Sequence, residues 1–478
     1  MTLSNETIAS LVRPDSVHKR VYTDPEIFEL EMQRIYGQAW IYVGHESQIK
    51  QPGDYHTTRL GNQDVVMVRA SDGKIYVLYN RCAHKGAKVV PDGDGSTGKF
   101  FRCPYHAWTF KLDGTHLSAP LRNGLQNTRF DPKDPEFSMR RVARVSVYRG
   151  FVFASQAEQG PDLETFLNGV KSSIDNLCDR SPTGEIEVAG GVFRVLQRSN
   201  WKVFYENLHD TMHAPVTHES SVVSARSQAE ELGTLPFELL IMEGNGEPYE
   251  FWEKLELRAY ENGHGYMEGI FDPAAAERDP VSSAHFAALT EAYGETRARE
   301  ILGMNRHNTV IYGSGSPHTV FQQFRVIRPL TVDRTLVEIQ LFKLKGAPEG
   351  VFNRALTYAN VINSPSSNVM PDDVEVYARC QEGNLTRGGD WVSMHRYAGT
   401  DREVEDGYVS INGTSELPMR NQFVAWKKFM LSIATDPRPL GSEVADDPAG
   451  CSGTCESSAS DDAGTPITLH RPANQGVA

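Results

Sequence analysis

The sequence predicts an α+β fold, in which a small all-β domain precedes a larger mixed α/β domain that combines an antiparallel sheet with helices. Between about residues 41 and 155, short alternating apolar runs are separated by Gly, Asp and Pro turns, a pattern typical of strands. From about residue 160, longer helical segments alternate with strands. The 478 residues are 39% hydrophobic, enough for a sizeable core, which excludes a mostly disordered or collagen-like chain.

Residues 1–40 are predicted to form a helical segment that packs on the larger domain. Residues 24–40 carry several apolar side chains, among them Ile27, and we expect a helix there. Asp24 followed by Pro25 indicates an N-cap with proline in the first turn.

The small domain, residues 41–155, is predicted to contain strands over 64–70, 74–80 and 145–155. Their sequences are DVVMVRA, KIYVLYN and VSVYRGFVFAS. The turn sequences GNQD, SDGK and KLDG lie between such runs.

The larger domain, residues 156–435, is predicted to contain helices over 162–177 and around 355–382. Strands are expected over 318–330 and 335–346. No internal repeat of fixed period is present.

The last residues, 436–478, are rich in Asp, Ser, Gly, Pro and Ala, and we expect a flexible tail. Cys451 and Cys455 lie in it without a second pair of ligands, so we discount a metal site there. Cys178 and Cys380 are expected to pack as small apolar residues.

Charge and composition exclude several classes of function. The net charge is −14, from 48 basic and 62 acidic residues, which argues against nucleic acid as a partner. No apolar run approaches the roughly 18 residues of a membrane span, and no secretory signal is evident, so we expect a cytoplasmic protein. Neither a Gly-x-x-x-x-Gly-Lys phosphate loop nor a strand-linked Gly-x-Gly-x-x-Gly is present, so we expect no nucleotide cofactor on the chain itself.

Two Cys/His pairs in the small domain predict a metal centre. Cys82 and His84 form a Cys-x-His pair, and Cys103 and His106 form a Cys-x-x-His pair. A 2Fe–2S cluster with two cysteines on one iron and two histidines on the other fits this set, and imidazole ligands raise its reduction potential. A structural zinc site of two cysteines and two histidines is the main alternative.

The segments around these pairs resemble a known family. NRCAHKGA followed by FRCPYHAWTFKLDG resembles the Rieske domain of ring-hydroxylating oxygenase large (alpha) subunits, and WIYVGHESQIKQPGDY resembles the entry to that domain. Ala107 stands where the family usually has Gly, and Lys85 where Arg is common. Neither position is that of a cluster ligand.

A second group of polar residues lies in NWKVFYENLHDTMHAPVTHE. A helix through 201–212 would place Asp210 and His213 on one face, at i and i+3. His213 and His218 would be about 140° apart on a straight helix, so a shared metal requires a break, which we expect at Pro215. Two histidines and a carboxylate form the facial triad of non-haem Fe(II) oxygenases. Histidines on a solvated helix face are the alternative.

The spacing of Asn207, Asp210, His213 and His218 resembles that in the catalytic domain of the same family, so the resemblance covers roughly residues 20–435. It implies a larger domain of the helix-grip type. It also implies a substrate pocket lined from about residue 220 to 365.

The resemblance implies a third iron ligand far downstream. PDDVEVYARCQEG, at 371–383, is the best match, with Asp373 as the ligand and Asp372 in reserve. The alternative for either residue is an N-terminal helix cap.

By the same resemblance, Asp210 bridges His106 of one subunit and His213 of its neighbour, accepting a hydrogen bond from each ring. Asn207 belongs to the same catalytic motif. His209 is expected to be no ligand.

The resemblance implies one 2Fe–2S cluster and one mononuclear non-haem Fe(II) per chain. The implied function is a terminal oxygenase that hydroxylates an aromatic compound with dioxygen and two externally supplied electrons. Cis-dihydroxylation of a ring is the first expectation, with an aromatic acid as one candidate substrate. A monooxygenase, acting by hydroxylation or O-demethylation, is the alternative. A Rieske electron carrier and a zinc-stapled binding protein are the non-enzyme alternatives.

The implied partners are a ferredoxin, a reductase or both, so that NAD(P)H acts only indirectly. A homotrimer of large subunits is expected, with or without a small beta subunit (α3 or α3β3).

Overall fold

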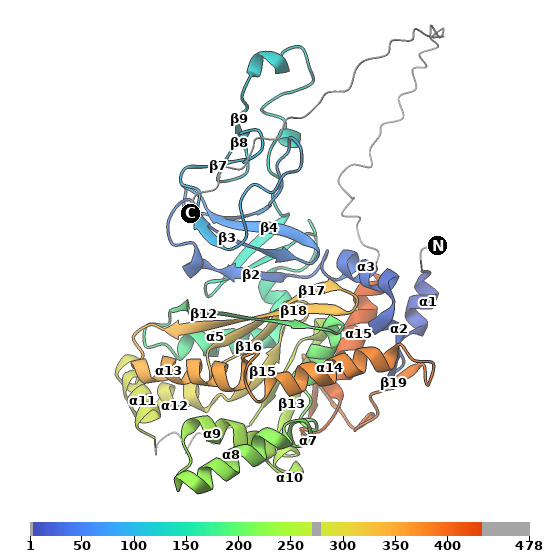
Figure 1. The fold of residues 1–478 in the computed structure, drawn as a ribbon, viewed down its shortest axis with the longest axis vertical. Coiled ribbons are helices and arrows are strands. Elements are labelled where there is room, and N and C mark those ends of the chain that lie inside the picture. The colour runs from blue at the N-terminus through green and yellow to red at the C-terminus, as the bar shows by residue number, and fades with distance from the viewer. Residues whose placement is uncertain (1–2, 270–278, 433–478) are drawn as a thin grey trace, which may run out of the picture. The chain divides into compact units, whose positions relative to one another are not determined.

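A computed structural model describes residues 3–269 and 279–432, and it confirms the α+β fold class (Figure 1). The strands of each sheet pair antiparallel, as expected. The predicted tail, with Cys451 and Cys455, lies outside the described residues.

The smaller part of the chain contains three antiparallel sheets. Their orders are β5-β4-β3-β6, β7-β8-β9 and β10-β11-β2. The strands are β2 Ile41–His45, β3 Asp54–Leu60, β4 Gln63–Arg69, β5 Ile75–Tyr79, β6 Asp94–Ser96, β7 Phe100–Arg102, β8 Thr109–Lys111, β9 His116–Ser118, β10 Arg144–Tyr148 and β11 Phe151–Ser155.

The larger part contains two antiparallel sheets, β12-β18-β17-β16 and β15-β14-β13-β21-β20. A bridge between Ile311 and Gly315 lies where β15 gives way to β16. The strands are β12 Ile186–Gln197, β13 Glu256–Tyr260, β14 Gly265–Glu268, β15 Arg306–Val310, β16 Gly315–His318, β17 Gln323–Thr331, β18 Arg334–Leu344, β20 Arg402–Val404 and β21 Gly407–Ser410.

Helices cover these sheets, and α13 and α14 run across them in Figure 1. The helices are α4 Leu163–Leu167, α5 Lys171–Asp179, α6 Trp201–Leu208, α7 Ala214–Thr217, α8 Glu219–Leu232, α9 Phe237–Glu243, α10 Tyr249–Trp252, α11 Pro280–Tyr293, α12 Glu295–Gly303, α13 Glu349–Tyr358, α14 Met370–Asn384 and α15 Leu417–Leu431. A π-helical stretch, Ala359–Asn363, follows α13.

The N-terminal elements are α1 Asn5–Ser10, β1 Ser16–His18, α2 Arg20–Thr23 and α3 Pro25–Arg34, and β1 pairs with β19 Trp391–Ser393. Glu31 of α3 is fully buried and lies 2.6 Å from Lys202 Nζ. Its carboxylate also accepts hydrogen bonds from the indole nitrogens of Trp201 and Trp426. Because a buried charge needs such partners, Glu31 fixes α6 and α15 against the N-terminal segment.

The predicted strands agree with β4, β5, β10, β11, β17 and β18 to within a few residues at most ends. The predicted helix over 24–40 begins as expected, because Asp24 Oδ1 accepts a hydrogen bond from the Glu26 amide at 2.9 Å. Its end was predicted too late. The helix stops at Arg34 and turns follow, where Gly37 weakens helical propensity.

The two largest hydrophobic clusters of the described residues support the sheets. One fills the sheets around the Cys/His pairs and includes Val66, Leu78 and Phe110. The other joins β2 and β11 to the larger sheets, where Tyr42 stacks on Phe324 at 4.4 Å. Because the sheet of β2, β10 and β11 shares the larger core, the predicted domain boundaries stay predictions.

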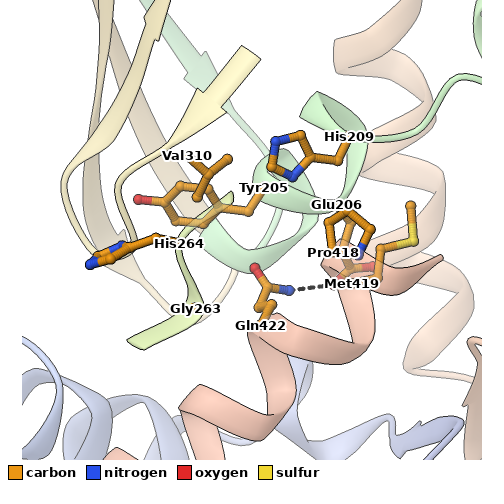
Figure 2. Close-up of a pocket in the computed structure, with 9 residues that line it drawn as sticks. All are labelled: Tyr205, Glu206, His209, Gly263, His264, Val310, Pro418, Met419 and Gln422. Atoms are coloured by element: carbon orange, nitrogen blue, oxygen red, sulfur yellow. Dashed lines mark hydrogen bonds between the residues drawn. The ribbon is translucent and has the colours of Figure 1, made fainter. Parts of the chain in front are cut away.

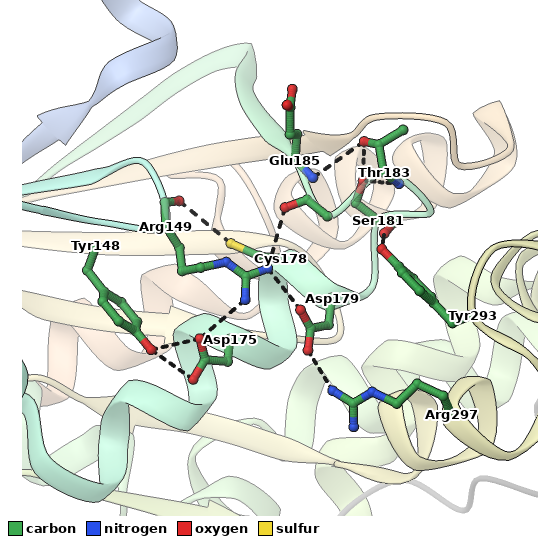
Figure 3. A network of polar contacts seen from close by, with 11 residues as sticks. Tyr148, Arg149, Asp175, Cys178, Asp179, Ser181, Thr183, Glu185, Tyr293 and Arg297 are labelled. Carbon is green, nitrogen blue, oxygen red and sulfur yellow. Dashed lines mark hydrogen bonds and ion pairs between the residues drawn. The ribbon is translucent and has the colours of Figure 1, made fainter.

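A polar network also ties the hairpin of β10 and β11 to helices α5 and α12 (Figure 3). The Tyr148 hydroxyl donates to Asp175 Oδ1 at 2.8 Å, and Arg149 donates to Asp179 at 2.8 Å. Arg297 of α12 donates to the other oxygen of Asp179 at 2.7 Å. Tyr148 and Arg149 thus hold the hairpin against the larger part of the chain.

Of the two cysteines expected to be packed, Cys178 is buried, and its sulfur lies 3.8 Å from the Arg149 carbonyl oxygen (Figure 3). The prediction for Cys380 is wrong, because this residue is exposed on α14. The sequence pattern did not fix the phase of that helix. None of the helices in the described parts of the chain is long and apolar enough to cross a membrane.

Candidate metal centres

The four residues of the Cys/His pairs lie on two neighbouring loops. Cys82 and His84 follow β5, and Cys103 and His106 lie between β7 and β8. The Cys82 amide donates to the Ala87 carbonyl at 2.8 Å, which closes the first loop. Both cysteines are buried, and the two imidazole rings lie 4.7 Å apart between centroids. The fold thus brings all four side chains to one end of the small sheets.

The donor set fits a two-iron cluster better than a single zinc ion. Burial raises the pKa of the Cys82 thiol, so the thiolate needs a compensating cation. His84 Nδ1 is buried without a hydrogen-bond partner. Ligand atoms around one tetrahedral ion lie about 4 Å apart or closer. No three ligand atoms of these four residues lie within 4.8 Å of one another, since the described residues contain just one such group, and it lies elsewhere.

Aromatic side chains support the second loop. Trp108 stacks on His84 with ring centroids 4.9 Å apart and planes 4° apart. Ala107 has φ +55°, a left-handed conformation that glycine adopts more easily. The loop therefore keeps a glycine-like turn although Ala107 carries a Cβ atom.

The second site brings together His213, His218 and Asp373, whose ligand atoms all lie within 4.8 Å of one another. Asp373 Oδ1 lies 3.6 Å from His213 Nε2 and 3.4 Å from His218 Nε2. Both histidines have an Nδ1 atom without a hydrogen-bond partner. Two imidazoles and one carboxylate turned to one point fit a mononuclear Fe(II) with open positions.

The predicted helix through 201–212 is wrong at its end, because α6 stops at Leu208. The i,i+3 argument for Asp210 and His213 therefore fails. A turn brings them together instead, in which Asp210 Oδ1 accepts a hydrogen bond from the Met212 amide at 2.7 Å.

The chain break expected at Pro215 occurs before that residue. Pro215 lies in the first turn of α7, where its missing N–H costs nothing. His213 precedes α7, and His218 lies between α7 and α8. One short helical turn thus separates the two imidazoles, which lets both face Asp373.

Asp373 and Asp372 lie in the first turn of α14, but neither caps it, since Val369 is the N-cap and makes no side-chain bond. Asp372 Oδ2 lies 3.5 Å from His218 Nδ1, on the other side of that ring from Asp373. Burial lowers the pKa of His218, but hydrogen bonding to Asp373 and the neighbouring charges outweigh burial and raise it. The two carboxylates therefore hold the His218 ring from both sides.

Asn207 and Asp210 complete the surroundings of His213. Asn207 Nδ2 donates to Asp373 Oδ1 at 3.2 Å and lies 3.1 Å from His213 Nε2. Asp210 Oδ2 lies 3.9 Å from His213 Nδ1, which has no hydrogen-bond partner. His106, the predicted second partner of Asp210, is exposed on the small sheets.

Comparison with known proteins matches both sites to one family. Residues 39–129 match the Rieske 2Fe-2S domain, and residues 187–426 match the catalytic domain of the ring hydroxylating alpha subunit. The chain belongs to the ring-hydroxylating oxygenase alpha subunits. It is thus an oxidoreductase of the dioxygenase family, with a Rieske cluster and a mononuclear iron as cofactors. Alpha subunits of this family receive electrons from a ferredoxin or a reductase.

Two relatives align with this alpha subunit over most of their length. Toluate 1,2-dioxygenase subunit alpha of Pseudomonas putida is 32% identical over 413 residues, which cover 83% of this chain and 86% of the relative. The anthranilate 1,2-dioxygenase large subunit of Acinetobacter baylyi is 31% identical over 436 residues, covering 87% and 89%. A structure of naphthalene 1,2-dioxygenase with bound indole shares the fold, with a TM-score of 0.74 and 24% identity over 88% of this chain and 94% of that chain.

Helix α6 of the alpha subunit is joined to α15 through Glu206 and Gln422 (Figure 2). Glu206 accepts hydrogen bonds from the Tyr22 hydroxyl at 2.8 Å and from Gln422 at 3.2 Å, beside a cavity of about 10 Å³. His209 Nε2 lies 2.6 Å from the Asn308 carbonyl oxygen. His209 is not in the group of three candidate ligands, and its predicted role as a non-ligand stays a prediction.

Glu206 should make the stability of the alpha subunit depend on pH. Burial raises the pKa of Glu206 from 4.5 to about 7. A carboxyl with a raised pKa stabilises the fold while protonated, so this contribution is full below pH 4.5 and is lost as the pH rises to about 7. Glu206→Gln stays neutral, and we expect its melting temperature to fall less than that of the wild type between about pH 5 and pH 8.

Circular dichroism melts over this pH range measure the difference. Glu238→Gln, at an exposed position on α9, is the matched control and should follow the wild type. Parallel curves for Glu206→Gln and wild type would show that Glu206 is already ionised in the folded protein.

Two adjoining cavities lie beside the iron site. One of about 90 Å³ is lined by the three ligand residues, and another of about 640 Å³ is lined mainly by apolar side chains such as Leu240 and Phe321. The cavities share five lining residues: Asn245, Trp252, His307, Tyr358 and Ile362.

All five shared residues fall in the region from about 220 to 365 that was expected to line the pocket. Other lining residues, such as Arg180 and Phe204, lie outside it. Their position in the chain gave no signal, because the sheets bring distant segments to the cavity.

Proposed function

We propose that this alpha subunit is the terminal oxygenase component that adds both atoms of dioxygen to the ring of an aromatic compound, giving a cis-dihydrodiol. The observation that carries the proposal is the group of His213, His218 and Asp373 on the wall of an apolar cavity, in the same chain as the two Cys/His pairs. The names of the two relatives, a toluate and an anthranilate 1,2-dioxygenase, favour a ring of an aromatic acid.

Three groups of side chains have separate roles in this proposal. His213, His218 and Asp373 hold the mononuclear site from one side and leave its other positions open. Asn207 donates a hydrogen bond to Asp373 Oδ1 and so fixes the orientation of that carboxylate. When bound, the cluster supplies electrons one at a time, and the Fe(II) supplies open coordination positions for dioxygen. Trp252 and Tyr358, both buried, shield the reacting ring from water.

Absorption and EPR spectra, with iron and sulfide analysis, test this function. We expect about two cluster irons and one mononuclear iron per chain, following the ligand sets. Colourless protein with zinc would mean a binding protein, and a cluster without the third iron would mean an electron carrier. Turnover with labelled dioxygen then counts the oxygen atoms in the product. A single labelled atom would point to the monooxygenase alternative.

The alpha subunit works as a homotrimer in this proposal, alone or with a beta subunit, in the cytoplasm. Support comes from the exposure of His106 and from Asp210, whose carboxylate is one-third exposed and faces the unpartnered Nδ1 of His213. An acidic side chain placed so can accept hydrogen bonds from its own His213 and from His106 of a neighbouring copy.

Asp210→Asn should therefore slow electron transfer more than it reduces metal content. The amide keeps the size of the side chain but removes the charge that accepts from both rings, and changes of this kind cost about 10–100-fold in activity. The measurement is the single-turnover reoxidation of the reduced cluster with substrate and dioxygen.

Asp372→Asn is the matched control, because Asp372 lies 3.5 Å from the Nδ1 of the other histidine, His218, and away from the proposed route. It should reoxidise near the wild-type rate once loaded with iron. Wild-type reoxidation by Asp210→Asn would make Asp210 a surface carboxylate without a bridging role.

A further inference from the structure

Arg325 of β17 places a cation in the wall of the cavity that holds the iron ligands. Arg325 is buried, with 6% of its surface exposed. Nη2 donates to Asn308 Oδ1 and lies 3.5 Å from Ser316 Oγ. Its Nε and Nη1 atoms make no hydrogen bond within the described parts of the chain, and no carboxylate oxygen there lies within 4 Å of its guanidinium.

Other buried arginines of the larger domain differ from Arg325 in this respect. Three of them have a carboxylate oxygen nearby: Arg306 that of Glu268 at 3.5 Å, Arg328 that of Glu338 at 3.6 Å and Arg420 that of Asp401 at 2.7 Å. The fourth, Arg180, has no such carboxylate among the described residues, but its Nε and Nη2 donate to Asn176 Oδ1 and to the Met304 carbonyl oxygen. A buried guanidinium without a counter-charge is unfavourable unless an anion from outside the chain completes it. The free edge of Arg325 is therefore a candidate anion site.

The cavity contains two carboxylates, and both are engaged elsewhere. Asp373 faces the two histidine rings, and Asp210 faces His213 Nδ1. Burial lowers the pKa of Arg325 and the charge of Asp373 opposes this shift, but neither carboxylate forms an ion pair with its guanidinium. A guanidinium offers two parallel N–H groups to a planar carboxylate, which fixes both the position and the orientation of the bound group.

We infer that Arg325 binds the carboxylate of the substrate and so makes this alpha subunit selective for an aromatic acid whose ring lies between Arg325 and the iron site. This inference rests on the proposed function and names the residue that selects the substrate. The shared apolar walls at Trp252 and Tyr358 would then contact the ring, while the larger cavity would accept its substituents.

A purely structural role is the competing explanation. Arg325 donates to Asn308, and Asn308 Nδ2 donates to the Leu208 carbonyl at the end of α6 at 2.8 Å. In that case, loss of Arg325 would destabilise the end of α6 and weaken the binding of every ligand to the same extent. The charge of the ligand separates the two roles, because only an anion site distinguishes an acid from its amide.

The test is calorimetric binding to iron-loaded full-length protein, with benzoate, 2-methylbenzoate and 3-methylbenzoate and the matching amides as probes. The wild type should bind at least one of the acids more tightly than its amide. Arg325→Gln should weaken binding of that acid by roughly 30-fold or more, the loss expected for an unpaired buried charge, and leave the amide within about threefold. The affinity of Arg325→Lys for that acid should lie between those of the wild type and Arg325→Gln. Lysine keeps the positive charge but cannot donate two parallel hydrogen bonds to a carboxylate.

Arg328→Gln is the matched control. Arg328 is also buried and lies on the same strand, but it lines neither of the two cavities, and its Nη1 donates to the Tyr42 carbonyl oxygen while its Nε lies 3.6 Å from Glu338 Oε2. It should bind acids as the wild type does, and thermal melts check that each variant folds.

Three binding results would overturn the inference: equal losses for acid and amide, loss of the acid in Arg328→Gln but not in Arg325→Gln, or a wild type that prefers amides. Failure of the proposed function looks different, because it appears as a missing cluster or iron signal or as no oxygen incorporation into any aromatic compound. A neutral aromatic compound that is dihydroxylated would uphold the function and refute the role of Arg325.

Discussion

Asp373→Ala should remove the mononuclear iron and all oxygenation, while Asp372→Ala should keep most of both. Among the described residues, Asp373 Oδ1 is the carboxylate oxygen that lies within 3.6 Å of both histidine Nε2 atoms. Asp372 instead lies 3.5 Å from His218 Nδ1, on the outer side of that ring. Removal of a ligand abolishes the site, whereas removal of a supporting partner costs about 10–100-fold in affinity, which excess iron offsets.

Iron analysis and EPR of the two variants measure the difference directly, and labelled dioxygen measures the activity. His213→Ala and His218→Ala should behave as Asp373→Ala does. In all three, the cluster spectrum should stay unchanged, because the Cys/His loops pack in a hydrophobic core of their own. Loss of iron in Asp372→Ala but not in Asp373→Ala would instead identify Asp372 as the ligand.

Cys103→Ala should remove the red-brown colour and reduce turnover to background. The Cys103 thiol is buried beside that of Cys82, and alanine offers no thiolate to complete a two-iron cluster. Without the cluster no electron reaches the second site, so the mononuclear iron stays bound but idle. Absorption spectra, sulfide analysis and turnover with a reductase measure these effects.

Cys178→Ala is the matched control for Cys103→Ala. Cys178 is equally buried, but it lies on α5 with its sulfur 3.8 Å from the Arg149 carbonyl oxygen (Figure 3). This variant should keep its colour and activity. A coloured and reducible Cys103→Ala protein would refute the assignment of the cluster ligands.

Local sequence patterns predicted the elements whose structure depends on neighbouring residues in the chain. Alternating strands and turn residues predicted β4, β5 and the β10–β11 hairpin, and the spacing of His213 and His218 required a chain break that the structure contains. The predicted helix through 201–212 failed because Asp210 prefers to accept a hydrogen bond from the Met212 amide in a turn.

Tertiary packing determines the features that the sequence did not predict, among them which residues line the cavity. Phe324, Arg325 and Val326 are all buried, so both faces of β17 are covered and alternation could not separate a core residue from a cavity residue. Likewise, the position of Asp373 rather than Asp372 in the group with His213 and His218 depends on the phase of α14. That phase follows from contacts of the helix with other elements, which no local pattern contains.

The two histidines and Asp373 meet only when α14 is docked against α6 and α7. A metal ion that binds these three residues therefore joins segments far apart in the chain, as a reversible cross-link would. Binding that occurs only in the native state increases the free energy of unfolding by mass action, in proportion to the logarithm of the free ion concentration. We therefore expect iron supply to affect the lifetime of the polypeptide as well as its activity. With little free iron, α14 should be released more often and proteases should reach the chain sooner.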